Sequence, residues 1–153
     1  MLTSCGEVDI ALDVRHAPRT TASFVYLVRH GFYDGLTFHR IVTGYVIQGG
    51  DPEGNGQGGP GYTVTEAPPP GLRYTRGVVA MAKTATDPRG ASGSQFYIVT
   101  APATALPADY ALLGRVVGPN AAVNAIDSVP NDPTTNSPLE PVVIDRVTIS
   151  QSP

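Results

Sequence analysis

The chain has 153 residues and a formal net charge of −3, which gives no electrostatic case for binding nucleic acid or an anionic membrane. No apolar run is long enough to span a membrane, and the single cysteine, Cys5, excludes an internal disulfide and a cysteine-based zinc site. This length suits one domain over residues 1–153. The 17 glycines and 15 prolines follow no repeat and separate many short apolar runs, which favours a mainly β or barrel architecture.

The N-terminal part predicts a hairpin followed by a helix. Residues 2–12 alternate loosely around a turn and predict two short strands. Residues 18–31 carry a broad apolar stripe, with Pro18 suited to the first helical turn and Gly31 to the C′ position. His30 falls in the last turn, where a cation complements the helix dipole, so we interpret it as a helix-end residue rather than a catalyst.

Residues 38–51 place two apolar, β-prone runs on either side of a Thr-Gly turn and predict a hairpin. Arg40 and Gln48 interrupt these runs. A cation and an amide are costly to bury without partners. We therefore expect both residues to hold the fold or to contact a ligand.

The glycine-rich segment 52–61 resembles two ligand-binding motifs but fits neither. Three of its glycines match G-x-G-x-x-G, yet a β-like run at 62–65 follows where a nucleotide site needs a helix. A calcium loop could begin at Asp51, but its twelfth position is Tyr62 rather than a bidentate Glu. We predict a surface loop in which glycines adopt positive φ.

The second half of the chain predicts further strands and one more helix. The predicted strands span residues 77–82, 94–99, 110–117 and 142–150. A helix over 120–128 has Asn120 as its candidate N-cap. In all, about eight short strands and two helices fit an antiparallel barrel with helices at its ends, which leaves no exposed edges.

Conventional catalytic sets find little support. His16, His30 and His39 fall in different elements without metal-ligand spacing. Ser92 and Ser94 lie in a glycine-rich loop that misses the nucleophile-elbow pattern by one place. We therefore expect neither a metal nor a hydrolase.

Amides, one arginine and apolar or aromatic groups recur on adjacent predicted strands and in one loop. Such a surface could bind an extended peptide, with apolar groups holding a side chain and polar groups meeting the backbone. A barrel core containing two satisfied glutamines is the alternative, and spacing alone does not choose between them. The residues concerned are Arg40, Tyr45, Val46, Gln48, Gln95, Tyr97 and Leu106.

Several motifs together resemble a cyclophilin, in particular the compact bacterial type, and they cover nearly the whole chain in order. The resemblance implies a closed eight-stranded antiparallel β-barrel capped by two α-helices, and peptidyl-prolyl cis-trans isomerase activity without a cofactor. The motifs are F-H-R-I at 38–41, Q-G-G-D at 48–51, Met-Ala at 81–82, G-S-Q-F-Y-I at 93–98, L-G-R-V at 113–116 and P-V-V-I at 141–144.

Carried over by position, the resemblance implies that Arg40 is the catalytic residue. The proline pocket would be lined by Tyr45, Val46, Tyr97 and Leu106, and the peptide backbone would be flanked by Gln48, Ala82, Lys83 and Gln95. Tyr110 stands where many members have a pocket His, and Lys83 where the family often has Asn. Ala105 falls where cyclosporin-sensitive members carry a Trp, so we expect weak cyclosporin binding.

The resemblance implies proline-containing polypeptides as partners, with assistance to protein folding as the role. We expect a monomer, and neither nucleic acid nor a membrane as partner. The departures at Val46, Tyr97 and Ala105 leave one alternative open, a catalytically weak proline-peptide-binding chaperone or scaffold. Because residues 1–4 carry no export signal, we expect a cytoplasmic protein; an exported or lipid-anchored protein with a trimmed N-terminal segment is the alternative.

Overall fold

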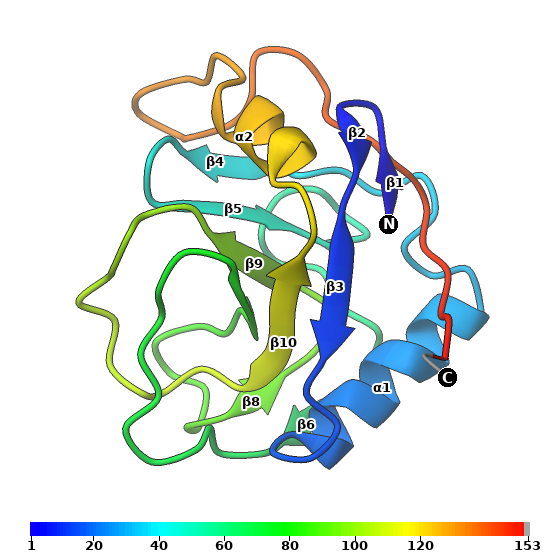
Figure 1. The fold of residues 1–153 in the computed structure, drawn as a ribbon, viewed down its shortest axis with the longest axis vertical. Coiled ribbons are helices and arrows are strands. Elements are labelled where there is room, and N and C mark those ends of the chain that lie inside the picture. The colour runs from blue at the N-terminus through cyan, green and yellow to red at the C-terminus, as the bar shows by residue number, and fades with distance from the viewer. Residues whose placement is uncertain (152–153) are drawn as a thin grey trace.

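The computed structural model describes residues 1–151, with eleven strands and two helices (Figure 1). The first part of the chain forms β1 (Leu2–Thr3), β2 (Gly6–Glu7), β3 (Asp9–Leu12), α1 (Pro18–Arg29), β4 (Arg40–Val42), β5 (Val46–Gly49) and β6 (Val64–Thr65). The rest forms β7 (Val78–Met81), β8 (Ala91–Ser92), β9 (Phe96–Val99), β10 (Leu112–Val117), α2 (Ala121–Asp127) and β11 (Ile144–Arg146).

Nine of these strands surround one interior, all in antiparallel pairs, and they make eight barrel strands because β2 and β3 continue each other. Six strands follow the order β3-β10-β7-β9-β5-β4, and a second sheet follows β11-β1-β2. Only Val8 separates β2 from β3, so the two act as one bent strand that joins the sheets at one edge. At the other edge Thr37 pairs with Val143, and the Phe38 N–H donates to the Val142 carbonyl at 2.9 Å. With β6 and β8 paired apart from the rest, the predicted eight-stranded barrel is confirmed.

The barrel wall has an inner and an outer apolar face, because successive side chains on a strand point in opposite directions. Ile41, Ile47, Ile98 and Val79 pair in register across four strands and are fully buried in the interior. Their neighbours point outward into a second cluster, which includes Val46, Val78, Ala80, Tyr97, Val99 and Leu112. This outer cluster is the apolar surface on which the candidate site is built.

The two helices close the ends of the interior (Figure 1). Phe24 and Leu27 of α1 belong to the same buried cluster as Val123 and Ile126 of α2. Both helices therefore owe their positions to apolar burial against the barrel.

Both predicted helices are confirmed, close to their predicted ends. Pro18 begins α1, and Gly31 follows its end with φ +67°, the left-handed conformation expected at C′. Asn120 occupies the N-cap of α2 as predicted, although its side chain makes no cap hydrogen bond. Its backbone carbonyl accepts the first hydrogen bond of the helix, from the Asn124 N–H at 2.9 Å.

The strands are shorter than the sequence predicts, because side chains take backbone partners away from the ladders. β11 ends at Arg146, and the next N–H, of Val147, donates to the Asp34 carboxylate at 3.0 Å. The two-residue strand β8 lies between the predicted strands 77–82 and 94–99, where we predicted no strand, and it pairs with β6.

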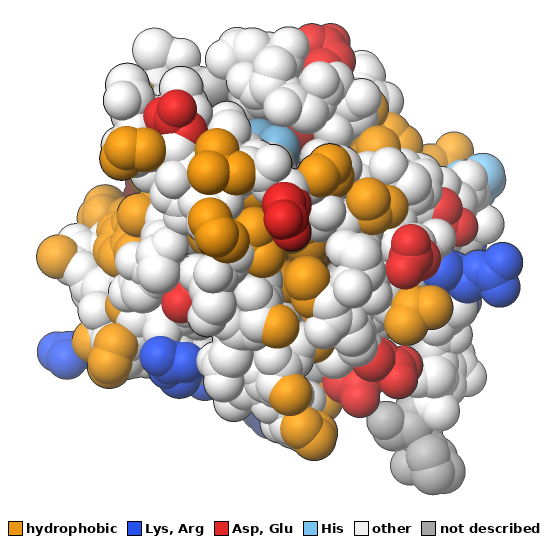
Figure 2. All heavy atoms as spheres, turned by 90° about the horizontal axis from the view of Figure 1, so that it is seen from above, with side chains coloured by type: hydrophobic (Ala, Val, Ile, Leu, Met, Phe, Trp, Pro, Cys, Tyr) orange, Lys and Arg blue, Asp and Glu red, His pale blue; other side chains and the backbone are white. Residues whose placement is uncertain are grey.

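No helix within residues 1–151 has the length and apolar character needed to cross a membrane. Viewed from above, the face that carries α2 mixes apolar and acidic side chains (Figure 2). Lys and Arg side chains appear only near the margins of this view, without a concentrated basic patch.

Candidate active site

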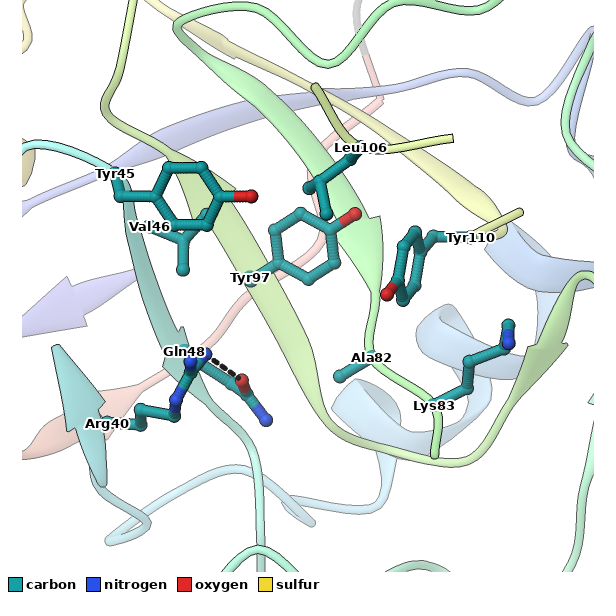
Figure 3. Close-up of a pocket in the computed structure, with 9 residues that line it drawn as sticks. All are labelled: Arg40, Tyr45, Val46, Gln48, Ala82, Lys83, Tyr97, Leu106 and Tyr110. Atoms are coloured by element: carbon teal, nitrogen blue, oxygen red, sulfur yellow. Dashed lines mark hydrogen bonds between the residues drawn. The ribbon is translucent and has the colours of Figure 1, made fainter. Parts of the chain in front are cut away.

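The site begins at the β4–β5 hairpin, where Arg40 and Gln48 lie directly opposite each other. Residues paired across two antiparallel strands project to the same face, so both side chains reach the outer surface of the barrel. Arg40 Nη1 donates to Gln48 Oε1 at 3.4 Å (Figure 3). The hairpin turn is held by α2, because the Gly44 N–H donates to the Asp127 carboxylate at 3.0 Å.

Hydrogen bonds continue from Arg40 through two amides to the glycine-rich loop. Gln48 Nε2 donates to Gln95 Oε1 at 3.0 Å, and Gln95 Nε2 donates to the Gly58 carbonyl at 2.9 Å. Each amide donates through its nitrogen and accepts through its oxygen. Gln95 thereby holds Gln48, and Gln48 in turn orients the guanidinium of Arg40.

Asp51 anchors the glycine-rich loop at its start. Its carboxylate accepts hydrogen bonds from the backbone N–H groups of Glu53, Asn55 and Gly56. Burial alone would raise the pKa of Asp51, but these backbone donors, together with His39, lower it below its ordinary value. Gly54, Gly56 and Gly61 adopt positive φ, as predicted for a surface loop.

A pocket of about 290 Å³ opens beside Arg40 on the outer face of the barrel. Its size suits one small ring rather than a drug-sized ligand. Tyr97 of β9 lies at its centre, Val46 and Ala82 flank the ring, and Leu106 covers it from a loop (Figure 3). The pocket is therefore an apolar recess with a cationic fork of donors at one side.

The structure brings together all ten residues that the resemblance placed in the site. Nine of them line the pocket, and Gln95 is joined to it through its hydrogen bond with Gln48. The alternative of a barrel core with two satisfied glutamines is wrong, because both amides lie partly exposed on the outer face. The lining residues are Arg40, Tyr45, Val46, Gln48, Ala82, Lys83, Tyr97, Leu106 and Tyr110.

Lys83 differs from the expected peptide-flanking side chain, because its ammonium is already engaged. Nζ lies 2.6 Å from the Asp109 carboxylate and 5.4 Å from the centre of the Tyr110 ring. The side chain is only 5 % exposed. Lys83 therefore lines the pocket while binding the neighbouring loop.

Tyr74 and Asp109 are site neighbours that the sequence analysis did not identify. The Tyr74 ring packs edge-on against Tyr110 with centroids 5.9 Å apart, and Asp109 holds Lys83. Both residues lie outside every helix and strand, so no periodicity marked them.

His39 stands beside Arg40 in sequence but outside the pocket. Its two ring nitrogens are buried and have no hydrogen-bond partner among residues 1–151. Burial lowers the pKa of His39, a nearby Asp51 partly opposes that effect, and Arg40 adds to it. Burial thus favours the neutral imidazole, and His39 does not line the pocket.

The chemistry available at the site is hydrogen-bond donation next to an apolar recess. Within the described chain, no group of three or more His, Cys, Asp or Glu side chains could hold a metal ion. The pocket has the Arg40 guanidinium as a donor and the Tyr110 ring at its wall, and no histidine is among the residues that line it. Such a site can grip a small ring and polarise a group beside it.

A family model for cyclophilin-type peptidyl-prolyl cis-trans isomerases matches residues 1–149. The chain belongs to the cyclophilin family. It is 37% identical to peptidyl-prolyl cis-trans isomerase B of Streptomyces anulatus, over 96% of this chain and 93% of that protein. Identity with peptidyl-prolyl cis-trans isomerase-like 1 of Mus musculus is 38%, over 92% and 82% of the two chains.

A solved cyclophilin shares the fold closely. The crystal structure of a Cryptosporidium parvum cyclophilin-type peptidyl-prolyl cis-trans isomerase, in the presence of the dipeptide Ala-Pro, superposes with a TM-score of 0.91 at 28% identity. The match covers 99% of this chain and 98% of that one. The predicted family, fold and enzyme class are therefore confirmed: this cyclophilin is a peptidyl-prolyl cis-trans isomerase.

The Tyr97 hydroxyl gives a first prediction, because it is buried without a hydrogen-bond partner in the described part of the chain. An unpaired buried hydroxyl costs about 1–3 kcal/mol. Replacing Tyr97→Phe should therefore raise the free energy of unfolding by about 1 kcal/mol in urea denaturation. Because the ring remains, kcat/KM should change by less than about threefold.

Tyr33→Phe is the matched control for this experiment. The Tyr33 hydroxyl is equally buried but donates to the Ser94 carbonyl at 2.9 Å, so the same substitution should destabilise the protein by about 1 kcal/mol. A comparable loss of stability in Tyr97→Phe would show that its hydroxyl is paired in solution.

His39 gives a prediction about pH. Its folded-state pKa lies below the unfolded value of about 6.5, so between these two values the unfolded chain binds a proton that the folded one does not. Stability attributable to His39 is thus complete above about pH 6.5 and falls as the pH is lowered towards the folded-state pKa. His39→Gln should show a shallower loss between pH 7.5 and 5.5 in urea denaturation.

Isomerase activity tests the same residue independently. If His39 takes no part in proton transfer, kcat/KM of the folded protein should stay within about twofold across that pH range. A sigmoidal pH dependence that His39→Gln abolishes would assign the imidazole a catalytic role.

Proposed function

We propose that this cyclophilin accelerates rotation about X–Pro bonds in unfolded or flexible polypeptides, with Arg40 as the catalytic residue. The observation that carries the proposal is the Arg40 guanidinium, held by Gln48 at the side of an apolar pocket the size of a small ring. The Ala-Pro dipeptide named for the Cryptosporidium parvum structure supports proline-containing peptides as the ligands.

The reaction needs neither a nucleophile nor a metal, because no covalent bond is made or broken. The amide C–N bond has partial double-bond character, and rotation about it meets a barrier of ~18–20 kcal/mol. In the twisted transition state this resonance is lost, and a lone pair localises on the prolyl nitrogen. A donor aimed at that nitrogen binds the twisted form better than either planar form, which lowers the barrier.

Arg40 has the properties that this task requires. A guanidinium is protonated at every accessible pH and presents its donors in a rigid planar fork, so restraining one nitrogen sets the direction of the others. Gln48 restrains Nη1 by accepting its hydrogen bond at 3.4 Å. The remaining guanidinium donors are then available to a bound amide.

The proline ring would occupy the recess over Tyr97. Tyr45, Val46 and Leu106 would enclose it, while Gln48 and Gln95 would meet the peptide backbone. Burial of the ring stabilises both planar isomers as well as the twisted form, so it holds the substrate in place beside Arg40. The donor is what distinguishes the transition state.

Arg40→Ala should lower kcat/KM for a short X–Pro peptide by about one to two powers of ten. A hydrogen bond to a charged group contributes about 1.5–3 kcal/mol, and about 1.4 kcal/mol corresponds to a tenfold change in rate. The measurement is a proline-isomerisation assay, or NMR exchange on the same peptide. Equal rates for wild type and variant would refute the role of Arg40.

The assay also separates the enzyme from a scaffold. A protein that binds the peptide but does not accelerate isomerisation, with or without Arg40, would be a proline-peptide-binding module. Arg19→Ala is the control for loss of an arginine, because Arg19 lies on α1 and does not line the pocket. Its kcat/KM should equal that of wild type.

Cyclosporin binding should be weak, because Ala105 offers no aromatic surface beside the pocket. Ala105 is exposed and immediately precedes the pocket residue Leu106. We expect a Kd above about 1 µM for the wild type and at least tenfold tighter binding for Ala105→Trp, since an added buried aromatic contact is worth more than about 1.4 kcal/mol. Calorimetry on both proteins checks this, and a submicromolar Kd for wild type would contradict it.

A further inference from the structure

One wall of the proline pocket is a segment without helix or strand. Residues 104–110 carry Leu106 and Tyr110, which both line the pocket. A segment of this kind keeps a defined shape only if neighbouring residues supply partners for its backbone. The residues that hydrogen-bond to the backbone of 104–110 therefore determine the shape of this wall.

Tyr74 contacts both ends of this wall segment. Its backbone carbonyl accepts from the Thr104 N–H at 3.1 Å and from Thr104 Oγ1 at 2.9 Å. At the other end its hydroxyl donates to the Tyr110 carbonyl at 2.6 Å and accepts from the Tyr110 N–H at 3.0 Å. One side chain thus satisfies both peptide groups of a pocket residue.

The Tyr74 ring also packs under the pocket. It is 1 % exposed, and its centroid lies 5.9 Å from that of Tyr110 and 6.3 Å from that of Tyr97. Tyr97 and Tyr110 themselves meet edge-on at 5.6 Å. The two pairs that include Tyr110 are edge-to-face, a favourable arrangement, and Tyr74 and Tyr97 are tilted by 49° to each other. The three rings therefore form one unit that joins the floor of the pocket to its wall.

A second set of contacts holds the wall from the neighbouring loop. Lys83 pairs with Asp109 at 2.6 Å and lies over the Tyr110 ring, and the Gly90 N–H donates to the Asp109 carbonyl at 2.8 Å. Arg89 Nε donates to the Ala108 carbonyl at 2.7 Å. Residues 108–110 are therefore restrained both by the loop that carries Lys83, Arg89 and Gly90 and by the hydroxyl of Tyr74.

We propose that Tyr74 is a positioning residue for substrate binding, which acts through the Tyr110 wall of the proline pocket. This rests on the proposed function, but it concerns how tightly the peptide is held rather than how fast the held bond rotates. Because Tyr74 does not line the pocket and its hydroxyl is bonded to the backbone of Tyr110, loss of that hydroxyl changes the pocket wall and leaves the Arg40 donor in place.

Tyr74→Phe tests this, since it removes the hydroxyl and keeps the ring. We expect KM for an X–Pro peptide to rise about three- to tenfold, with kcat changed by less than twofold. Amide hydrogen exchange at Tyr110 should accelerate by a similar factor, because its N–H loses its acceptor. An unchanged KM with faster exchange, or an equal fall in kcat, would overturn the proposal.

Thr3→Val is the matched control for loss of a buried hydroxyl. Thr3 Oγ1 also donates to a backbone carbonyl, that of Gly6, and accepts from a backbone N–H, that of Cys5, but it lies in β1 away from the pocket. Its KM should equal that of wild type even if its stability falls as much as that of Tyr74→Phe. A rise in KM for both variants would mark a general effect of lost stability.

Action through Tyr110 is tested by the double variant. In a Tyr110→Ala background the wall ring is absent, so adding Tyr74→Phe should raise KM by less than about 1.5-fold. A full three- to tenfold effect in that background would refute the coupling. Lys83→Gln tests the same wall if Tyr74→Phe does not fold, and it should raise KM while Thr3→Val does not.

Peptide affinity keeps this proposal distinguishable from the proposed function. If wild type showed no isomerisation, the Kd of the same peptide by NMR titration would replace KM as the readout. A weaker Kd in Tyr74→Phe would then support positioning by Tyr74, whereas the isomerase assignment of Arg40 would have failed on its own.

Discussion

The site depends on the hydrogen bond that joins Arg40 to Gln48 across the β4–β5 hairpin. A guanidinium on an apolar wall has many accessible rotamers, and only an external acceptor can select one. Gln48 supplies that acceptor, Gln95 holds Gln48, and the carbonyl of Gly58 holds Gln95. Hydrogen bonds in such a series restrain one another. The glycine-rich loop is thereby tied to the donor, which gives it a role without nucleotide or calcium binding.

The barrel provides this donor with its surroundings by using both faces of one wall. Interior residues such as Ile47 and Ile98 stabilise the fold, while their neighbours Val46 and Tyr97 form an outer cluster that loops cover incompletely. The uncovered part is the pocket. Because rotation about an amide requires no proton transfer, a histidine outside the pocket beside Arg40 and a tyrosine at the pocket wall are compatible with catalysis. Amide rotation requires only the shape of the pocket and the oriented donor of Arg40.

Physical reasoning on the sequence alone predicts the parts of this site that lie on regular structure. The pattern around Thr43 and Gly44 predicts the hairpin that carries Arg40 and Gln48. It does not predict their register, because Val42 pairs with Val46 across a three-residue loop rather than across a two-residue Thr-Gly turn. Lys83 and Tyr110 lie outside regular structure, where no period applies, and only the family resemblance assigned them to the site. Neither strand periodicity nor the family resemblance identified Tyr74, because its role depends on contacts with Thr104 and Tyr110, which are 30 and 36 residues away in the sequence. The short β6–β8 ribbon likewise reflects a tertiary pairing that local sequence does not predict.

The central claim is that Arg40 stabilises the twisted amide rather than the bound planar peptide. NMR exchange spectroscopy on an X–Pro peptide saturated with protein measures binding and on-protein isomerisation separately. For Arg40→Ala the account predicts a peptide Kd within about threefold of wild type and on-protein interconversion at least tenfold slower. A variant that interconverts bound peptide at the wild-type rate, and loses only affinity, would contradict it.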